Sequence, residues 1–355
     1  MFTAGEGKVL VGADFSQQEP RLLSQYSQDT NMINAYKEGK DLYATIASGV
    51  YKNGYWDNME HHEDGSPNPE GKKRRSNCKS LLLGIMYGRG PASIAEQIGA
   101  SMDEAQGIID NFYKSFPAVK QWTEQTEKDA KKNGYVVDLW GRRRRLPDIQ
   151  LPKYSVKYRG INIDFNPLFG SEGKLSNSSL LSKYQIRLKN VKSRKEYEKI
   201  KNEAFNEGVD ITDNGGFISQ AERQCVNARI QGGAASMSKI AMRKVFDNQE
   251  LKKLGFKLLL QVHDELIGEC PKENAEQCMN ILTDVMKHSV EPLVQVPFKC
   301  DGYIVPRWYD DDFGDIIREE YKFLIDKNMY SEDALNLLLS EHSELSREQL
   351  LNYIT

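Results

Sequence analysis

The stretch that decides the fold runs from residue 256 to 270 and reads FKLLLQVHDELIGEC. Two apolar runs flank only three polar residues, His263, Asp264 and Glu265. Apolar runs this short with so brief a connection predict a β-hairpin. Such a hairpin would hold Asp264 rigidly at its tip.

A second carboxylate follows another apolar run. Residues 8–13 (KVLVGA) predict a buried strand that ends at Asp14. Taken alone, an aspartate after a strand is most often a turn residue. Asp14 and Asp264 are 250 positions apart (264 − 14), so only tertiary structure can bring them together. Two adjacent aspartates supply the oxygen ligands that hard divalent cations take, and pairs of such cations about 3.5–4 Å apart catalyse phosphoryl transfer.

A third element is the helix predicted over residues 74–87. Four of its residues recur every four positions and therefore share one slowly winding face, about 18 Å long: Arg75, Lys79, Leu83 and Tyr87. The face is cationic at the N-terminal end, where the helix dipole also attracts anions, and apolar and aromatic at the other end. A periodic stripe is more often plain core, but a core stripe does not begin with Arg and Lys. The gradient fits a nucleoside triphosphate lying along the helix.

The rest of the chain mixes helices and strands without regular βαβ alternation, which predicts the α+β class. Residues 53–71 are expected to be a loop, and residues 150–219 a polar insertion with one charged helix. Further strands are expected over 135–139, 144–146 and 293–300, and helices over 20–50, 92–133 with a break at Pro117, 221–248, 272–288 and from 316 onward.

Composition bounds the class of protein. Apolar residues make up 39% of the 355 residues, which suffices for real cores. No apolar run is long enough to span a membrane, so we expect a cytoplasmic protein. The five cysteines are scattered, which disfavours a zinc site or a disulfide framework. The net charge is −3, but residues 316–355 carry eight acidic and four basic side chains, which leaves about +1 elsewhere and two basic clusters, 72–75 and 142–145.

Three ordered motifs resemble those of DNA polymerase family A, the DNA polymerase I type. Residues 14–21 (DFSQQEPR) resemble motif A, residues 75–88 resemble motif B on the fingers O-helix, and residues 261–265 (QVHDE) resemble motif C. Residues 141–148 (GRRRRLPD) and 227–232 are similar to two further family segments. The QQEP form of motif A is most similar to the bacteriophage branch.

The resemblance implies a right-hand polymerase palm, an antiparallel sheet, with helical fingers. The implied domains are palm at 1–22 and 220–310, fingers at 23–134, a junction hairpin at 135–149, the insertion at 150–219 and an acidic helical extension at 311–355. In relatives the thumb and the proofreading exonuclease domain precede motif A. We therefore expect both to be absent, so that a separate chain or a missing segment supplies them.

The implied function is template-directed DNA synthesis with two Mg²⁺ ions, or Mn²⁺ in their place. Asp14 and Asp264 would be the metal ligands, assisted by the backbone carbonyl of Phe15, with Glu265 beside the metals. Lys79 would bind the triphosphate and protonate the departing pyrophosphate.

Further roles follow from the same resemblance. Arg75 would hold the outer phosphates, and Glu19 would pack against Tyr87 to exclude a ribose 2′-hydroxyl. Gln17 and Leu83 complete the nucleotide site, although relatives usually carry Phe or Tyr where Leu83 stands. The implied primer-template contacts are His263, Arg223, Asn227, Gln231 and Arg142.

Other interpretations stay open. The chain is alternatively a non-catalytic primer-template-binding or docking subunit, which the intact Asp14, Lys79 and Asp264 disfavour. A two-metal nuclease would not need the triphosphate helix. The sequence 60–63 (EHHE) is more typical of surface than of a metal site, and 310–314 (DDDFG) lacks the other kinase elements. The basic insertion fits either a surface that tracks DNA or a partner, or a solvated surface. The C-terminal leucines fit either a docking element or a small core.

Overall fold

The computed structural model describes residues 2–159, 172–308, 313–327, 329–341 and 346–354. The DDDFG sequence falls mostly outside this part of the chain. The protein forms two compact units, one from Met1–Arg21 with Ala234–Thr355 and one from Leu22–Gly233. Within the described residues, no helix has both the length and the apolar character needed to cross a membrane.

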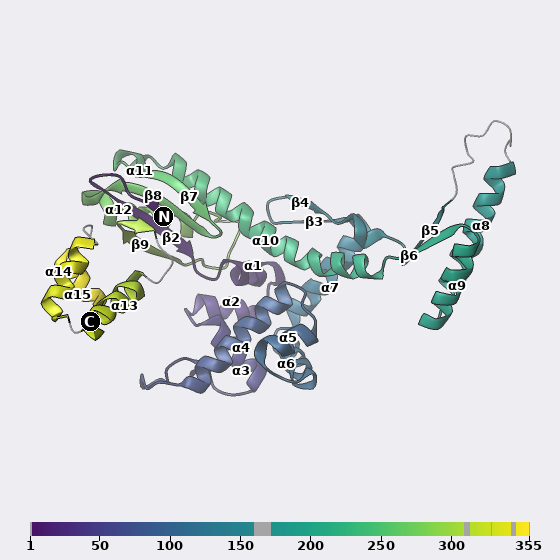
Figure 1. The fold of residues 1–355 in the computed structure, drawn as a ribbon, viewed down its shortest axis with the longest axis horizontal. Helices are drawn as coiled ribbons and strands as arrows, with labels where there is room; N and C mark the ends of the chain where they lie inside the picture. The colour runs from purple at the N-terminus through teal and green to yellow at the C-terminus, as the bar shows by residue number, and fades with distance from the viewer. Residues whose placement is uncertain (1, 160–171, 309–312, 328, 342–345, 355) are drawn as a thin grey trace. The chain divides into compact units, whose positions relative to one another are not determined.

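The first unit contains a four-stranded antiparallel sheet (Figure 1). Its strand order is β7 (Lys257–Val262), β8 (Glu265–Pro271), β2 (Lys8–Phe15) and β9 (Cys300–Val305). The predicted hairpin is confirmed, and its turn consists of only His263 and Asp264. The central position of β2 explains its apolar sequence, because it pairs with a strand on each side.

The strand expected over 293–300 is wrong. Strand β9 starts only at Cys300 and continues to Val305. Pro292 and Pro297 lack a backbone N–H and therefore disfavour a ladder in the preceding segment. The apolar residues there are buried without forming a strand, as Val294, Val296 and Phe298 show. The apolar residues of this segment led to the incorrect prediction of a strand.

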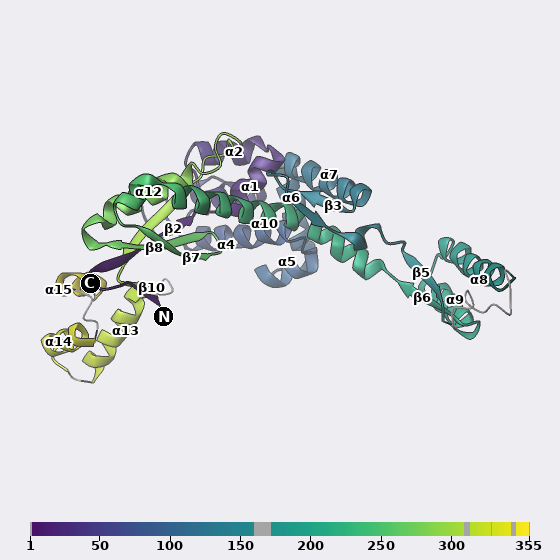
Figure 2. The ribbon, with the colours of Figure 1, turned by 90° about the horizontal axis from the view of Figure 1, so that it is seen from above.

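Helix α12 (Ala275–Lys287) contacts β2 and β9 and covers one face of the sheet (Figure 2). A Cβ at Gly302 would fall 2.7 Å from Met279 of this helix, so the helix approaches β9 closely there. The opposite face of the sheet is left for the site described below. The short strands β1 (Phe2–Thr3) and β10 (Arg307–Trp308) pair beside it.

The last helices in the described part of the chain are α13 (Phe313–Asp326), α14 (Ser331–Glu341) and α15 (Arg347–Ile354). They share a small core formed by Ile317, Leu335, Leu338 and Leu350. Of the two uses that the sequence left open for the C-terminal leucines, these residues serve as core.

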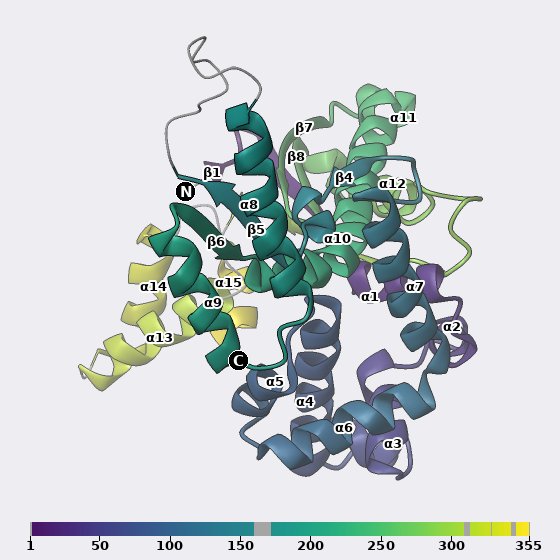
Figure 3. The same cartoon turned by 90° about the vertical axis from the view of Figure 1, so that its right-hand side faces the viewer.

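The second unit is mainly helical (Figure 3). Its helices before residue 134 are α2 (Thr30–Lys37), α3 (Leu42–Tyr51), α4 (Pro69–Met86), α5 (Pro91–Ile98), α6 (Met102–Ser115) and α7 (Pro117–Asn133), while α1 (Gln18–Ser27) and α10 (Gly215–Asp247) contribute residues to both units. Helix α4 begins five residues before the expected start. Asn68 Oδ1 accepts from Gly71 N at 2.9 Å, and Pro69 occupies the first turn, two features that favour a helix start.

The remaining strands lie in two hairpins. Strands β3 (Tyr135–Val137) and β4 (Arg143–Arg145) pair as the sequence predicted. The inserted segment is more than a polar excursion with one helix. It contains β5 (Tyr154–Tyr158), α8 (Glu172–Lys189), α9 (Arg194–Asn206) and β6 (Val209–Asp213), packed around its own core, which includes Tyr184, Tyr197 and Ile200. Its buried tyrosines explain why the composition looked polar.

Candidate active site

Carboxylates meet at one edge of the first unit's sheet. Asp14 of β2 stands directly opposite Glu265 of β8 and Asp301 of β9. Directly opposed residues of antiparallel strands place their side chains on the same face. Asp264 follows in the hairpin turn, and its carbonyl accepts a hydrogen bond from Phe15 N at 3.3 Å. Tertiary pairing therefore brings Asp14 and Asp264 together, as the sequence analysis expected.

The carboxyl group of Asp14 responds to this crowding. Loss of hydration raises its pKa to about 7, and the charges of Asp264 and Glu265, with a hydrogen bond to Asp264, act in the same direction. The residue as a whole remains exposed to solvent. The raised pKa of Asp14 thus has burial as its first cause and the neighbouring carboxylates as its second.

Two site residues adopt a backbone conformation that is unusual for side chains with a Cβ. His263 has φ 52° and Gln17 has φ 55°. His263 forms the turn that presents Asp264, and its carbonyl accepts from Gln261 Nε2 at 2.6 Å. Gln17 forms the turn from β2 into α1. Such conformations persist where the surrounding structure holds them, and they gather at functional sites.

Side-chain hydrogen bonds from Arg21 and Gln18 stabilise the turn that follows Asp14. Arg21 donates from Nε to the carbonyl of Ser16 at 2.8 Å and from a terminal nitrogen to the carbonyl of Pro297. Buried Gln18 donates to Ser238 Oγ of α10 at 3.1 Å. Within the QQEPR sequence, Gln18 and Arg21 therefore stabilise the turn, and Glu19 lies half-buried in the same unit.

In the second unit, helix α4 has two distinct faces. Its buried face carries Cys78, Leu81, Leu82, Ile85 and Met86, which pack toward α3 and α5. Lys79 is exposed, and Arg75, Leu83 and Tyr87 are half-buried. The inference that the four-residue stripe is not core is confirmed.

Arg75 is already engaged by acidic partners. Its guanidinium lies 2.8 Å from Asp41 Oδ2 and 3.2 Å from Glu60 Oε1, and it stacks over the Tyr43 ring at 5.6 Å. The hydrogen bond to Asp41 is the largest cause of the raised pKa of Arg75. A phosphate would have to displace these carboxylates. Glu60, in a segment expected to be bare surface, is therefore part of the Arg75 environment.

The C-terminal end of α4 meets α10 within the second unit. Tyr87 ends the helix, and Gly88 follows with φ 65°. A Cβ at Gly88 would fall 2.8 Å from Arg223 Cβ, so only glycine permits this approach. Two motifs that are far apart in the sequence are thereby brought into contact.

The predicted primer-template residues of this unit lie on α10 and on the β3–β4 hairpin. Arg223 and Gln231 are exposed, and Asn227 is half-buried. Asn227 Oδ1 is buried and has no hydrogen-bond partner within the described part of the chain. Arg142 is exposed, as are the arginines of β4 that follow it.

The sequence analysis missed two residues near these groups. Asp301 adds a third carboxylate to the Asp14 row, where it forms an ion pair with Lys299 at 2.7 Å. Recognising it needs the register of β9. Arg229 stacks on the rings of Tyr26 and Trp122 at 4.8 and 5.2 Å and joins α10 to its neighbours. No sequence pattern distinguishes Arg229 from the solvated arginines.

The predicted site residues thus form two sets, each assembled within its own unit. The first unit contains Asp14, Phe15, Gln17, Glu19, His263, Asp264 and Glu265. The second contains Arg75, Lys79, Leu83, Tyr87, Arg142, Arg223, Asn227 and Gln231.

The acidic set is chemically suited to a hard divalent cation. Among the described residues, no three His, Cys, Asp or Glu side chains form a ready-made metal site. This holds for the EHHE segment (residues 60–63) as well. The carboxylates of Asp14 and Asp264 nevertheless lie within hydrogen-bonding distance, and burial first and then the charge of Asp264 raise the pKa of Asp14. A bound cation would offset the negative charge of both carboxylates. Their all-oxygen donor set is the kind that Mg²⁺ and Mn²⁺ take.

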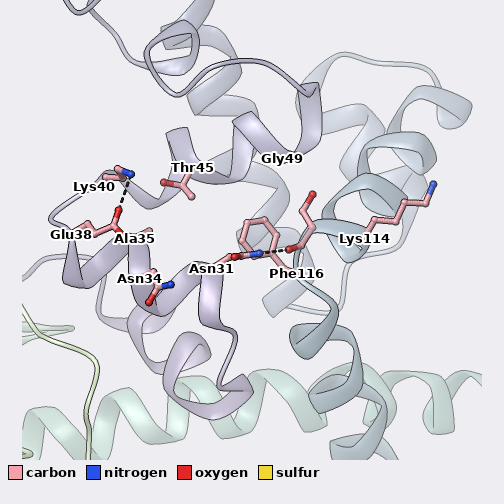
Figure 4. Close-up of a pocket in the computed structure, with 10 residues that line it drawn as sticks. Asn31, Asn34, Ala35, Glu38, Lys40, Thr45, Gly49, Lys114 and Phe116 are labelled. Atoms are coloured by element: carbon pink, nitrogen blue, oxygen red, sulfur yellow. Dashed lines mark hydrogen bonds and ion pairs between the residues drawn. The ribbon is translucent and has the colours of Figure 1, made fainter.

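A separate cavity of about 550 Å³ lies within the second unit (Figure 4). Its lining comes from α2, α3 and the end of α6 and includes Asn31, Thr45, Lys114 and Phe116. Asn31 Nδ2 donates across it to the carbonyl of Ser115 at 2.9 Å. None of the predicted site residues lines this cavity.

Comparison with known proteins matches residues 1–168 and 181–310 to the model of DNA polymerase family A. The thermostable DNA polymerase I of Thermus aquaticus is 29% identical over 309 residues, which are 86% of this chain and 28% of the relative. The DNA polymerase I of Geobacillus stearothermophilus is 29% identical over 302 residues, 85% and 26% of the two chains. The chain thus spans about a quarter of the length of these relatives.

The fold is similar to the polymerase domain of Pol1 from M. smegmatis, solved in complex with DNA primer-template and dNTP. The TM-score is 0.60 at 23% identity, over 86% of this chain and 41% of that one. This likeness confirms the expected mixed helix-and-sheet polymerase fold.

Proposed function

Because this chain belongs to DNA polymerase family A, we propose that it catalyses template-directed DNA synthesis, adding deoxynucleoside triphosphates to a primer 3′ end. The observation that carries the proposal is the convergence of Asp14, Asp264 and Glu265 from β2, the hairpin turn and β8. A sheet has no structural need to gather like charges, which repel one another. The convergence is accounted for by binding of divalent cations.

Asp14 and Asp264 would hold two Mg²⁺ ions, or Mn²⁺ in their place, with the Phe15 carbonyl as a further ligand and Glu265 beside them. When bound, these ions supply activation of the primer hydroxyl and stabilisation of the charge on the phosphates. The primer 3′ hydroxyl would give its proton to solvent water and its oxygen would bond to the α-phosphorus, while the bond from that phosphorus to the bridging oxygen breaks and pyrophosphate leaves.

The outward face of α4 suits the nucleotide. Exposed Lys79 would bind the triphosphate and give its proton to the departing pyrophosphate. Arg75 would exchange its carboxylate partners for the outer phosphates, while Leu83 and Tyr87 would face base and sugar. We propose that Glu19 helps to select the deoxyribose and that Gln17 contributes to the nucleotide site.

Primer-template DNA is the proposed macromolecular partner. His263 would approach the primer end, and the α10 residues Arg223, Asn227 and Gln231 would contact the nascent pair. The arginine-rich β4, with Arg142 just before it, suits contact with phosphates. The M. smegmatis polymerase domain, solved in complex with primer-template and dNTP, supports DNA as the partner.

We also propose a wider context. The QQEP form of motif A (residues 17–20) favours a bacteriophage replication protein in the cytoplasm of its host. We propose that a separate chain or a further segment supplies thumb and exonuclease functions.

Primer extension by the purified chain tests the proposal. We expect Mg²⁺-dependent addition of the template-matched deoxynucleotide, weak for the chain alone and stronger when polypeptide carrying the thumb is added. The matched Asp14→Asn variant should bind primer-template DNA but add no nucleotide. DNA binding without any extension, even after supplementation, would favour the alternative of a non-catalytic docking subunit.

A further inference from the structure

Tyr303 occupies a position on the site face of the sheet that the proposed mechanism does not use. It lies in β9 directly opposite Gly12 of β2. A Cβ at Gly12 would fall 2.2 Å from Tyr303 Cζ, so the ring fills the space that a side chain at position 12 would occupy. Glycine at this strand position is thereby explained by close packing of the tyrosine ring.

The phenol reaches across a whole strand. Its hydroxyl donates to Glu265 Oε1 at 2.5 Å. Glu265 belongs to β8, Tyr303 to β9, and β2 lies between them. The hydrogen bond therefore joins two strands across the strand between them. It passes over Gly12, which has no side chain to block it.

The direction of the hydrogen bond is fixed by a third residue. The side chain of Trp308 also hydrogen-bonds to Tyr303, and an indole N–H can only donate. The phenol oxygen is therefore the acceptor for Trp308, which leaves the phenol proton for Glu265. Burial first, and then the hydrogen bond to Glu265, raise the pKa of Tyr303, so the phenol keeps this proton.

Glu265 needs such a restraint. It stands opposite Asp14, and the like charges of Asp14, Asp264 and Glu265 repel one another. A glutamate has three rotatable side-chain bonds, and repulsion favours rotamers that turn its charge toward solvent. A donated hydrogen bond to a carboxylate is charge-assisted and strong enough to oppose this.

We propose that Tyr303 is a positioning residue, whose hydroxyl holds Glu265 beside Asp14 and Asp264 and so tunes the affinity of this cluster for divalent cations. The inference rests on the proposed function, because it assigns metal binding to the same carboxylates. Tyr303 itself touches neither nucleotide nor metal in this role. Glycine at position 12 is required for this role, because a side chain there would displace the Tyr303 ring.

Binding of Mn²⁺ to the purified full chain, measured by electron paramagnetic resonance without DNA or nucleotide, tests the inference. Tyr303→Phe removes the hydroxyl and keeps the ring. We expect its Mn²⁺ dissociation constant to rise about tenfold, the range typical for loss of a residue that orients a metal ligand. Tyr330→Phe removes a hydroxyl from a side chain that is 82% exposed and should bind Mn²⁺ as the wild type does.

A second variant approaches the same bond from the other side. Gly12→Ala keeps the hydroxyl but displaces the ring that carries it. We expect a similar loss of Mn²⁺ affinity, and no additional loss in the double variant with Tyr303→Phe, because both changes break one interaction. Circular dichroism and melting temperature establish that each variant is folded.

The outcomes separate the two proposals. Unchanged Mn²⁺ affinity in folded Tyr303→Phe, or tighter binding, would overturn the positioning role whatever the polymerase activity. A second outcome combines two results: Tyr303→Phe binds Mn²⁺ more weakly, and the wild-type chain never extends a primer. That outcome would refute the proposed function and leave the positioning role intact. Where extension is observed, the Mg²⁺ concentration for half-maximal rate should rise while KM for the deoxynucleotide stays constant.

Discussion

The sheet-borne carboxylates and the helix-borne cations are assembled in opposite ways. Asp14, Glu265 and Asp301 come from three strands and meet only through the register of β2 with β8 and β9. Arg75 and Lys79 lie on one helix, and their alignment follows from the four-residue spacing alone. The acidic set therefore depends on tertiary pairing, whereas the cationic set needs only that α4 forms.

The two sets of residues also differ in their electrostatic partners when no ligand is bound. Burial and the nearby charges of Asp264 and Glu265 raise the pKa of Asp14. Arg75 is neutralised by Asp41 and Glu60. In the sheet, like charges repel one another, and a bound cation can relieve that repulsion. On the helix, Arg75 is held by ion pairs that an incoming phosphate must replace.

The largest expected effect separates the two sets directly. Asp264→Asn should lower the rate of nucleotide addition at least about 10³-fold, because it removes a metal ligand, and Lys79→Ala about 10²-fold, because it removes one acid and phosphate contact. Single-turnover primer extension at saturating Mg²⁺ measures both.

Matched controls are available on exposed positions of the same chain. Asp103→Asn in α6 and Lys73→Ala on another side of α4 should leave the rate within about twofold, since surface changes rarely matter. A larger loss from Lys79→Ala than from Asp264→Asn would break the ranking of sheet over helix.

A smaller effect is expected from releasing Arg75. Asp41 caps α3 by accepting from Ala44 N through Oδ1 at 2.8 Å, and it uses Oδ2 for Arg75. Asp41→Asn keeps a good cap and removes the charge. We expect KM for the deoxynucleotide to fall about two- to fivefold, with kcat nearly constant, because the phosphate no longer competes with a carboxylate.

The control for this release is a change at the weaker partner. Glu60→Gln should lower KM less, because its contact with Arg75 is longer, at 3.2 Å, and its side chain is more exposed. A rise in KM in Asp41→Asn would show that Asp41 positions Arg75 for the phosphate, which would reverse the proposed competition.

The same contrast explains what the sequence predicted. Local patterns predicted the β7–β8 hairpin and the outward stripe of α4, because neighbours in sequence decide both. The pairing of β9 with β2 was missed, because buried apolar residues before Cys300 resemble a strand while the real strand contains Asp301, Gly302 and Tyr303. Asp301 and Tyr303 were therefore missed as well.

The insertion shows a second limit. Charged residues dominate α9, yet Tyr197 and Ile200 are buried against Tyr184 of α8. Amphipathic helices in a small module leave few apolar residues in the sequence, and tyrosine serves in the core although composition alone counts it as ambiguous. Such a module is recognised only when its elements are seen to pack.

The smallest expected effect concerns stability without metal. The pKa of Asp14 is raised to about 7 in the folded chain, against about 3.9 when unfolded. Between these values the folded state binds more protons than the unfolded state, so the stability contributed by Asp14 falls as pH rises from about 4 to 7. In EDTA, the melting temperature of the wild type should therefore decline over this window relative to Asp14→Asn, which cannot titrate there.

At pH 8 the repulsion is fully present, and a cation should relieve it. Added Mg²⁺ binds the folded state and should raise the melting temperature of the wild type by about 1–3 °C, but not that of Asp14→Asn. The matched change Asp103→Asn should respond to Mg²⁺ as the wild type does, because Asp103 is exposed and lies in the other unit. Parallel pH profiles and equal Mg²⁺ shifts in wild type and Asp14→Asn would mean that the sheet stores no repulsion, and the contrast between the two sets of residues would then rest on assembly alone.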